Sequence, residues 1–354
     1  MHLISISALL LALSAVPASA QWTPQPTGTT SSLRGIHAVS ARVAWASGSG
    51  GTVLRTTDGG ATWRADTIPG AGALDFRDIH ALDADTAWVL SAGDGAASTI
   101  WKTADGGRTW RRTWANPGPG GFFDAIAFWD AQHGIAVGDP VGGRFQVVLT
   151  DDGGESWHPL PDDALPPALP GEAAFAASGT ALVVHGAAEA WLGTGGGRVA
   201  RVFRSIDRGR SWTAAETPVA AGGSSSGIFS LAFADARHGV AVGGDYAKPA
   251  EPGDVIARTD DGGRSWRLAG RAAPPGYKSA VVAVPGTAGR ALVAVGLTGS
   301  GLSLDGGEHW TAVDGEAWHA ASFAAPDAGW VVGPQGRIAR WSGSALRAAA
   351  RPRR

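Results

Sequence analysis

The sequence predicts an all-β protein, a seven-bladed β-propeller whose blades are four-stranded antiparallel sheets. Three observations lead to this prediction: a turn motif that recurs every 44 to 55 residues, apolar strands that recur in step with it, and a composition rich in turn residues. Self-similarity at such intervals is typical of propeller blades. We expect a single propeller domain over residues 21–344.

The composition favours a folded, loop-rich β protein. The 354 residues include 53 glycines, 21 prolines and 16 tryptophans, and disordered chains lack such an aromatic content. The formal net charge of -2 gives no overall basic field for nucleic acid or anionic membranes, so we expect neither as a partner. The absence of cysteine excludes disulfides, thiolate nucleophiles and Cys-ligated metal sites.

The recurring motif, Ser/Thr-x-Asp-x-Gly-x-Ser/Thr-Trp, is suited to closing a tight hairpin. It first occurs as TTDGGATW at 56–63, and its sixth copy has His309 in place of the second hydroxyl residue. The glycine can adopt a positive φ, the carboxylate can accept backbone N–H groups, and the Trp can bury a large ring. We expect structural roles, rather than catalysis or calcium binding, for the six aspartates. They are Asp58, Asp105, Asp152, Asp207, Asp261 and Asp305.

Two apolar segments precede each turn motif. Together with the two strands that the turn joins, they give each unit four strands. Segments ending in glycine, such as 133–138 and 238–243, come shortly before the turn, and looser copies bring their number to seven. Another β-favouring segment, such as 125–128, precedes each of them. The last unit lacks the turn motif. We therefore expect the strand around Trp22 to complete that unit and close the ring.

Both ends of the chain lie outside the predicted propeller. Residues 1–20 contain an apolar stretch and end in Ala-Ser-Ala, which is typical of a signal peptide and too short to span a membrane. We expect cleavage near Ala20 and export to a periplasm or to the cell exterior, as a monomer. Residues 345–354 end in a basic cluster, and we expect them to form a disordered tail.

The turn motif resembles the Asp-box, or bacterial neuraminidase repeat. Together with the glycine-ended strands, it resembles the seven-bladed propeller family of photosystem II assembly factors over residues 22–342. The resemblance to assembly factors implies a non-catalytic scaffold. The wider superfamily also includes sialidases, xyloglucan hydrolases and sorting receptors, so the function has to be argued from the site.

We expect a ligand to bind at the channel mouth. By analogy with known propellers, the innermost strands begin on the ligand-binding face, so side chains at these starts surround the mouth. Two further aspartates, Asp139 and Asp245, either reach across the mouth or cap their own turns, and we favour capping. The candidate binding residues are Arg34, Arg77, Asp124, Glu172, Ser230, Lys278, His319, Asp139 and Asp245.

The leading interpretation is an exported, non-catalytic propeller that binds a protein segment or a small anionic ligand. Its binding groups are the cations of a rim formed by Arg34, Arg77 and Lys278. The alternative is a glycan hydrolase, because Asp124 and Glu172 in adjacent blades could supply the two carboxyl groups that such an enzyme needs. The arginine triad that sialidases use is not evident in the sequence.

An oxidoreductase is the third and weakest interpretation. The nearest match to a dinucleotide-binding fingerprint, residues 193–198, has Arg198 at the position of the last glycine and leads into a strand rather than a helix. The histidines form no close ligand pair. We therefore predict no cofactor and no metal site.

Overall fold

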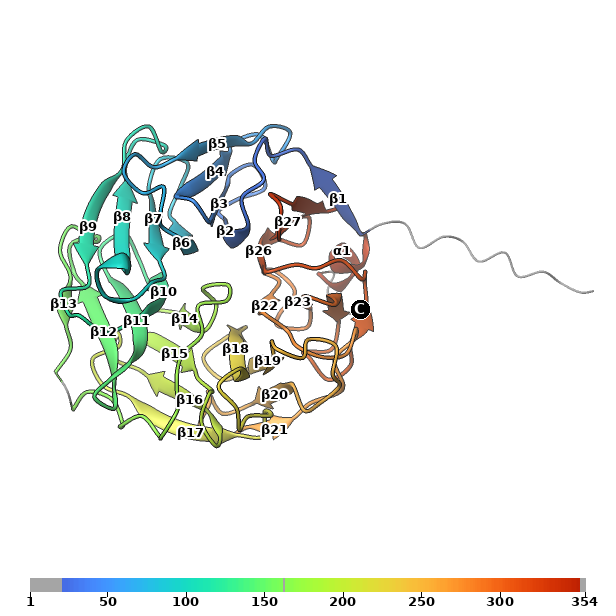
Figure 1. The fold of residues 1–354 in the computed structure, drawn as a ribbon. Coiled ribbons are helices and arrows are strands. Elements are labelled where there is room, and N and C mark those ends of the chain that lie inside the picture. Colours follow the sequence, from blue (N-terminus) through green and yellow to red (C-terminus); the bar gives the residue numbers. More distant parts are fainter. Residues whose placement is uncertain (1–20, 162, 351–354) are drawn as a thin grey trace, which may run out of the picture.

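The computed structural model describes residues 21–161 and 163–350. They form seven four-stranded antiparallel sheets arranged in a ring (Figure 1), which confirms the predicted fold. The expected signal peptide and the basic residues 351–354 lie outside the described residues. Within the described part, no helix is both long enough and apolar enough to cross a membrane.

We number the blades from 1 to 7 in chain order, starting at β2, and each blade runs from the axis to the rim. The innermost strands are β2 (Leu33–Ala38), β6 (Phe76–Ala81), β10 (Phe123–Phe128), β14 (Leu182–His185), β18 (Ser226–Phe233), β22 (Ala280–Ala283) and β26 (Ala320–Ala325). The second strands are β3 (Ala44–Gly48), β7 (Ala87–Ser91), β11 (Gly134–Val141), β15 (Glu189–Gly193), β19 (Gly239–Asp245), β23 (Leu292–Gly296) and β27 (Ala328–Val332). The third strands are β4 (Thr52–Thr56), β8 (Thr99–Thr103), β12 (Arg144–Thr150), β16 (Ala200–Ser205), β20 (Ile256–Thr259), β24 (Gly299–Ser303) and β28 (Ile338–Trp341). The outermost strands are β5 (Arg64–Thr67), β9 (Arg111–Ala115), β13 (His158–Pro159), β17 (Thr213–Thr217), β21 (Arg267–Leu268), β25 (Thr311–Ala312) and β1 (Trp22–Gln25).

The N-terminal strand closes the ring, as predicted. β1 pairs antiparallel with β28, and Trp22 lies opposite Trp341. The Trp22 side chain is buried, and its ring centroid lies 4.9 Å from that of Trp341. The seventh blade thus joins the two ends of the propeller in one sheet, so opening the ring would expose this aromatic contact.

Within residues 21–161 and 163–350, two short helical segments accompany the strands. A 3-10 helix, η1 (Gly95–Ala97), lies between β7 and β8. The α-helix α1 (Ala345–Ala349) follows β28, where we expected a disordered tail. Leu346 of α1 is fully buried and packs in one apolar cluster with Val293 of blade 6. Its apolar side chain explains why this part of the tail is ordered on the propeller.

The six repeated turns connect the third strand of a blade to its outermost strand, and their hydrogen bonds are local. The Asp58 carboxylate accepts hydrogen bonds from the Thr56 hydroxyl at 2.8 Å and from the N–H and hydroxyl of Thr62 at 2.9 and 2.6 Å. Bonds from Thr62 and Thr56 lower the pKa of Asp58 to about 2. The other five turns repeat the bond from the N–H four residues on, at Asp105, Asp152, Asp207, Asp261 and Asp305. Each carboxylate thus closes its own hairpin.

The core lies between neighbouring blades rather than within one sheet. One apolar cluster joins Trp88 of blade 2 to Phe128 of blade 3, for example, and these rings are stacked with centroids 3.9 Å apart. Offset or stacked aromatic pairs add to the stabilisation that area burial provides. The repeated blades are therefore held by contacts that each makes with the next.

Candidate functional site

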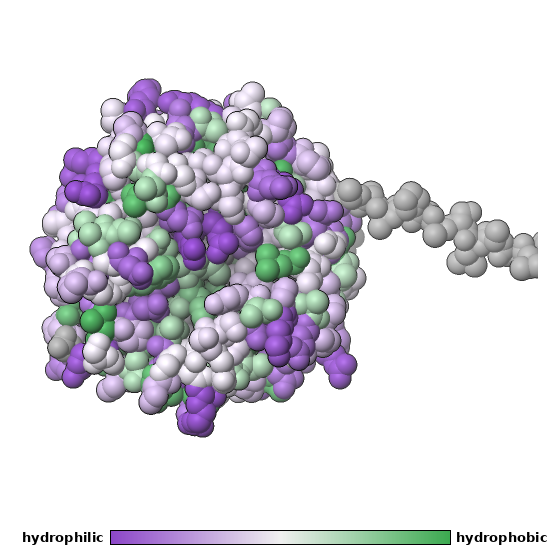
Figure 2. All heavy atoms as spheres, in the orientation of Figure 1, coloured by the Kyte–Doolittle hydropathy of each residue, from purple (hydrophilic) through white to green (hydrophobic). Residues whose placement is uncertain are grey.

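A cavity of about 460 Å³ opens at the end of the ring where the innermost strands begin. We call it the mouth cavity. In the view of Figure 2, hydrophilic and hydrophobic residues meet at the centre of the ring. Five of the nine candidate binding residues line the mouth cavity, namely Arg34, Arg77, Asp124, Asp139 and His319.

A β-bulge near the start of the innermost strand turns side chains toward the mouth cavity. In blades 1, 2, 3 and 5 the pairing register shifts by one residue at this point. A bulge leaves its extra residue unpaired and re-aims that side chain. The unpaired residues are Arg34, Arg77, Asp124 and Phe229, and all four line the cavity.

Among the described residues, Arg34 has no ion-pair partner within 4 Å. Its Nε atom is buried and makes no hydrogen bond, and burial together with the nearby charge of Arg77 lowers the pKa of Arg34. Arg77 differs, because its Nε lies 2.7 Å from the Asp75 carboxylate. Arg34 therefore has hydrogen-bonding capacity left for an anion.

Two carboxyl groups face the arginines from blade 3. Asp124 is 1% exposed and its Oδ2 has no hydrogen-bond partner; burial and then the charge of Asp139 raise its pKa well above the ordinary value. Burial raises the pKa of Asp139 to about 6. The Asp139 carboxylate accepts the N–H of Ala174 at 2.8 Å, so it reaches toward blade 4 instead of capping its own turn.

His319 lies in blade 7 at the position that Arg34 occupies in blade 1. Its Nδ1 donates a hydrogen bond to the Leu33 carbonyl at 2.8 Å. Burial, followed by the charge of Arg34, lowers the pKa of His319 to about 4, so the ring is neutral at pH 7. It adds a polar group to the cavity without adding a charge.

An aromatic wall completes the mouth cavity. The rings of Phe175 and Phe229 stack with centroids 3.9 Å apart, and Tyr277 meets Phe229 edge-on at 4.8 Å. Tyr246, which is 49% exposed, extends the wall outward. Sequence reasoning did not select Phe175, Tyr246 or Tyr277 as binding residues, because all three lie outside the strands, where an alternating pattern does not show which way a side chain faces.

Blade 4 sends a segment across the mouth, which sequence reasoning also missed. Residues 173–177 line the mouth cavity, and Figure 1 shows the chain before β14 inside the ring. Arg77 of blade 2 donates to the Ala176 carbonyl at 3.4 Å, whereas the Ser178 hydroxyl donates to the Ser279 carbonyl of blade 6 at 2.8 Å. The segment thus links blades on different sides of the axis, and apart from Phe175 its cavity-lining residues are alanines.

Glu172 lies in a buried ion pair rather than in the mouth cavity. Its side chain has no exposed surface and pairs with Arg201, whose Nε donates to Oε1 at 2.8 Å. The carboxylate also accepts the Thr194 hydroxyl at 2.6 Å and the Leu169 N–H at 2.8 Å. Because its oxygens are held by these donors, Glu172 does not form with Asp124 the carboxyl pair that the alternative interpretation requires.

Lys278 does not belong to the cationic rim. It lies one residue before Ser279, which lines the mouth cavity, and is itself only 1% exposed. Its Nζ is 3.4 Å from the carbonyls of Gly276 and Tyr277, and burial lowers its pKa to about 8. Lys278 lies two residues before β22, and its neighbour Ser279, rather than the lysine, lines the cavity.

Ser230 and Asp245 also have local roles. Ser230 follows the bulged Phe229, is fully buried, and its hydroxyl oxygen accepts the Val281 N–H at 2.8 Å, so it links blades 5 and 6. The Asp245 carboxylate accepts the Ala247 N–H at 2.9 Å, which is the turn capping that we favoured. Neither residue lines the mouth cavity.

Comparisons with known proteins support the fold. No known family and no curated protein matches the sequence. Among solved structures, YCF48 bound to D1 peptide is similar with a TM-score of 0.66 and 16% identity, over 94% of this chain and 100% of that chain. YCF48 from Cyanidioschyzon merolae is similar with a TM-score of 0.62 and 18% identity, over 91% and 99% of the two chains. The resemblance noted from the sequence is thereby confirmed for the fold.

A glycoside hydrolase has a similar fold as well. The GH74 enzyme of Niastella koreensis has a TM-score of 0.61 and 14% identity, over 90% of this chain but 53% of that one. At such identities the likeness shows the fold and leaves the chemistry to the residues of the site. Among the described residues, no group of three or more His, Asp or Glu side chains is placed to hold a metal ion.

Proposed function

We propose that this protein is an exported, non-catalytic propeller that holds a segment of another protein in the mouth cavity. An anionic group of that segment would bind the Arg34 guanidinium. The buried, unpartnered Nε of Arg34 carries this proposal, because an unpaired buried donor is unfavourable and an anion that accepts its hydrogen bond removes the deficit. A planar guanidinium is also suited to carboxylate recognition.

The other walls of the mouth cavity fit a polypeptide. Phe175, Phe229, Tyr246 and Tyr277 offer an apolar surface for a side chain next to the anionic group, and binding sites combine such surfaces with a few polar groups. A cavity of about 460 Å³ takes a few side chains rather than a folded domain. YCF48, which is similar in fold, has been solved with a D1 peptide bound, and this supports a protein segment as the ligand.

The charges of the mouth would orient that segment. Arg34 and Arg77 lie on blades 1 and 2, whereas Asp124 and Asp139 lie on blade 3. The Asp139 carboxyl group, whose pKa is about 6, is mostly ionised at pH 7 and repels an anion, so the anionic group is directed to the arginine side. This polarity gives specificity for direction as well as for charge.

A peptide array tests the proposal. Each sequence is displayed in two forms, one with Asp or Glu and one with the matching Asn or Gln, and is probed with the full chain. We expect peptides that bind only in the acidic form, and loss of their binding in Arg34→Met. The matched control is Arg42→Met at an exposed position away from the cavity. Equal binding by wild type and Arg34→Met would rule out the assigned role of Arg34.

A glycan hydrolase is the second candidate, and one observation favours it. Asp124 and Asp139 share the mouth cavity, and both have raised pKa values, which suits a general acid. Release of reducing sugar from polysaccharides by the wild type, abolished in Asp124→Asn with the fold intact, would establish this activity. Peptide binding without sugar release would favour the scaffold.

A further inference from the structure

Tryptophans on the second strands fill the spaces between blades. Trp45, Trp88, Trp191 and Trp330 share one register position in β3, β7, β15 and β27, and each is at most 1% exposed. The indole N–H of Trp88 donates to the Gly153 carbonyl at 3.1 Å, and that of Trp191 donates to the Gly262 carbonyl at 2.8 Å. Both acceptors are the same glycine of the repeated turn in the next blade.

A basic residue on the third strand faces each of these rings. Its charge lies 5.4 Å from the ring centroid of Trp45, 5.5 Å from that of Trp88 and 5.2 Å from that of Trp330, which is cation–π geometry. The residues opposite the four tryptophans in register are Arg55, Lys102, Arg204 and Arg340. A ring and a cation therefore occur together at this position.

The remaining three blades have an aliphatic residue in place of the tryptophan. In blades 3 and 6 the facing residue is aliphatic too, because Ile135 faces Leu149 and Val293 faces Leu302. Blade 5 breaks this rule, since Val240 faces Arg258. It keeps the cation of the pair but lacks the ring.

The two fully aliphatic positions are filled by other parts of the chain. Val293 packs in a cluster with Leu346 of α1, and Ile135 packs in a cluster with the buried Trp212. Val240, which is 3% exposed, likewise packs in a cluster with the turn tryptophan Trp310 of blade 6, but here a cavity of about 560 Å³ also lies between blades 5 and 6. We call it the interblade cavity.

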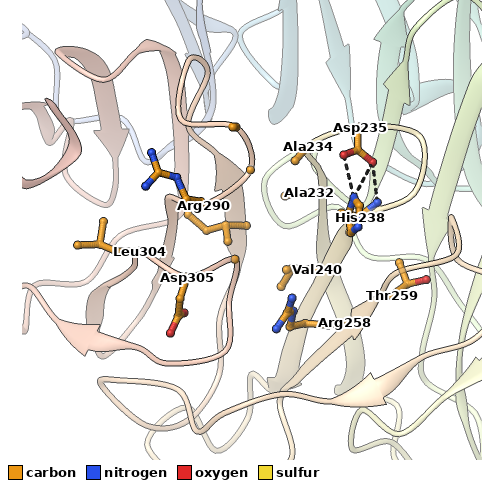
Figure 3. A pocket seen from close by; sticks show the side chains of 15 residues that line it. Ala232, Ala234, Asp235, His238, Val240, Arg258, Thr259, Arg290, Leu304 and Asp305 are labelled. Atoms are coloured by element: carbon orange, nitrogen blue, oxygen red, sulfur yellow. Dashed lines mark hydrogen bonds and ion pairs between the residues drawn. The ribbon is translucent and has the colours of Figure 1, made fainter. Parts of the chain in front are cut away.

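The interblade cavity has the walls of an indole site (Figure 3). Val240 and Arg258 line it from blade 5, and Leu304, which is 43% exposed, lines it from blade 6. Gly306 also lines it, at the position in its turn of Gly153 and Gly262. Within the described residues, the Gly306 carbonyl accepts no indole N–H, whereas the carbonyls of Gly153 and Gly262 do. The other two rings donate elsewhere, Trp45 to the Asp83 carbonyl and Trp330 to Gln25 Oε1.

We propose that the interblade cavity binds the side chain of a tryptophan from another polypeptide, in place of the missing ring. The ring would lie in the space that Val240 and Arg258 line, and its N–H would donate to the Gly306 carbonyl. Arg258 is held in place by an ion pair with Glu308 of blade 6, so little ordering is needed on binding. The site is independent of the mouth cavity.

A tryptophan side chain suits the cavity better than a free indole. The four rings that serve as templates are themselves tryptophan side chains on extended backbone. The volume of about 560 Å³ lies in the range of ligand sites and leaves room for the stem and flanking peptide groups. Asp235 and His238, which pair with each other and line the same cavity, place polar groups there for those peptide groups.

Methyl NMR on the full-length protein tests this assignment. N-acetyl-tryptophanamide is titrated into protein with labelled valine methyl groups, and N-acetyl-leucinamide serves as the apolar control without a ring. We expect saturable shifts of the Val240 methyl signals in the millimolar range with the tryptophan probe alone. Shifts with free indole but none with N-acetyl-tryptophanamide would overturn the assignment to a polypeptide, and absence of shifts with either would overturn the site.

Variants of the cavity provide the second test. Val240→Trp supplies the missing ring from within, so it should weaken N-acetyl-tryptophanamide binding by more than tenfold. Arg258→Leu, which copies the aliphatic pairing of blade 3, should weaken it by about two- to fivefold through loss of the cation–π contact. Arg34→Met alters the mouth cavity and should leave this binding unchanged. Unaltered binding in a folded Val240→Trp protein would overturn the proposal, and the wild-type titration decides it if that variant does not fold.

Discussion

Replacing Glu172 with glutamine should destabilise the propeller strongly, because Glu172 neutralises a buried cation. The Glu172 side chain has no exposed surface, that of Arg201 is 10% exposed, and the carboxylate also receives the Thr194 hydroxyl and the Leu169 N–H. Breaking a buried ion pair at one partner lowers the free energy of unfolding by about 3–5 kcal/mol. The glutamine side chain would keep the shape of the glutamate but would turn its NH₂ group toward the donors of Arg201, Thr194 or Leu169. We therefore expect a loss in this range.

Urea unfolding of the full chain measures this loss, and an exposed pair provides the matched control. Glu216 lies 3.7 Å from Arg198, and both side chains are more than half exposed, so Glu216→Gln should change the free energy of unfolding by at most about 1 kcal/mol. The double variant Glu172→Met with Arg201→Met should recover most of the loss, since no charge stays buried. A loss below about 1 kcal/mol in Glu172→Gln would refute the structural role.

Three further outcomes are expected. Asp139→Asn removes a carboxyl group whose pKa is about 6 in the fold and about 3.9 when unfolded. Because the folded state holds this proton more tightly, urea unfolding should show wild type losing stability relative to the variant as pH rises from about 4 to about 6; a constant difference would contradict this. The pKa of Asp58 is lowered to about 2 by hydrogen bonds from Thr62, so its stabilising contribution is lost as pH falls from about 4 to about 2, and thermal scans should show a smaller acid loss in Asp58→Asn. Trp22→Ala should lower the free energy of unfolding by about 3–5 kcal/mol in urea, because the ring is 6% exposed, and a loss under about 1 kcal/mol would show that ring closure does not depend on it.

The fold could be predicted because each blade repeats its local chemistry. The turn that contains Asp58 closes its hairpin with hydrogen bonds inside eight residues, so the local sequence is enough to predict the turn. Ring closure through Trp22 followed from the missing strand of the last unit. The helix at Ala345–Ala349 was missed because its order comes from packing of Leu346 against other blades, which no local pattern records.

The mouth was only partly predictable, because a bulge changes which side chain faces the axis. Arg34, Arg77 and Asp124 were found since the bulged residue is itself polar. In blade 5 the bulged residue is Phe229; of the pair Phe229 and Ser230 at this strand start, the polar Ser230 was selected as the binding residue, and Phe229 is the one that lines the cavity. A period-2 pattern cannot locate an inserted residue, and a shift of one residue turns a side chain to the other face.

Repetition and variation mark different parts of this molecule. At the second-strand position of Trp45, four of the seven blades carry tryptophan. The residue type repeats because the side chain packs against the next blade in each case. At the start of the innermost strand the cavity-lining residue is Arg34 in blade 1, Asp124 in blade 3 and Phe229 in blade 5. It can vary because a side chain that faces the axis does not pack between two blades. By the same logic, Val240 opposite Arg258 is informative as an exception within a repeated position. In a ring of like blades, binding sites are expected where the repeat fails, and both cavities described above lie at such places.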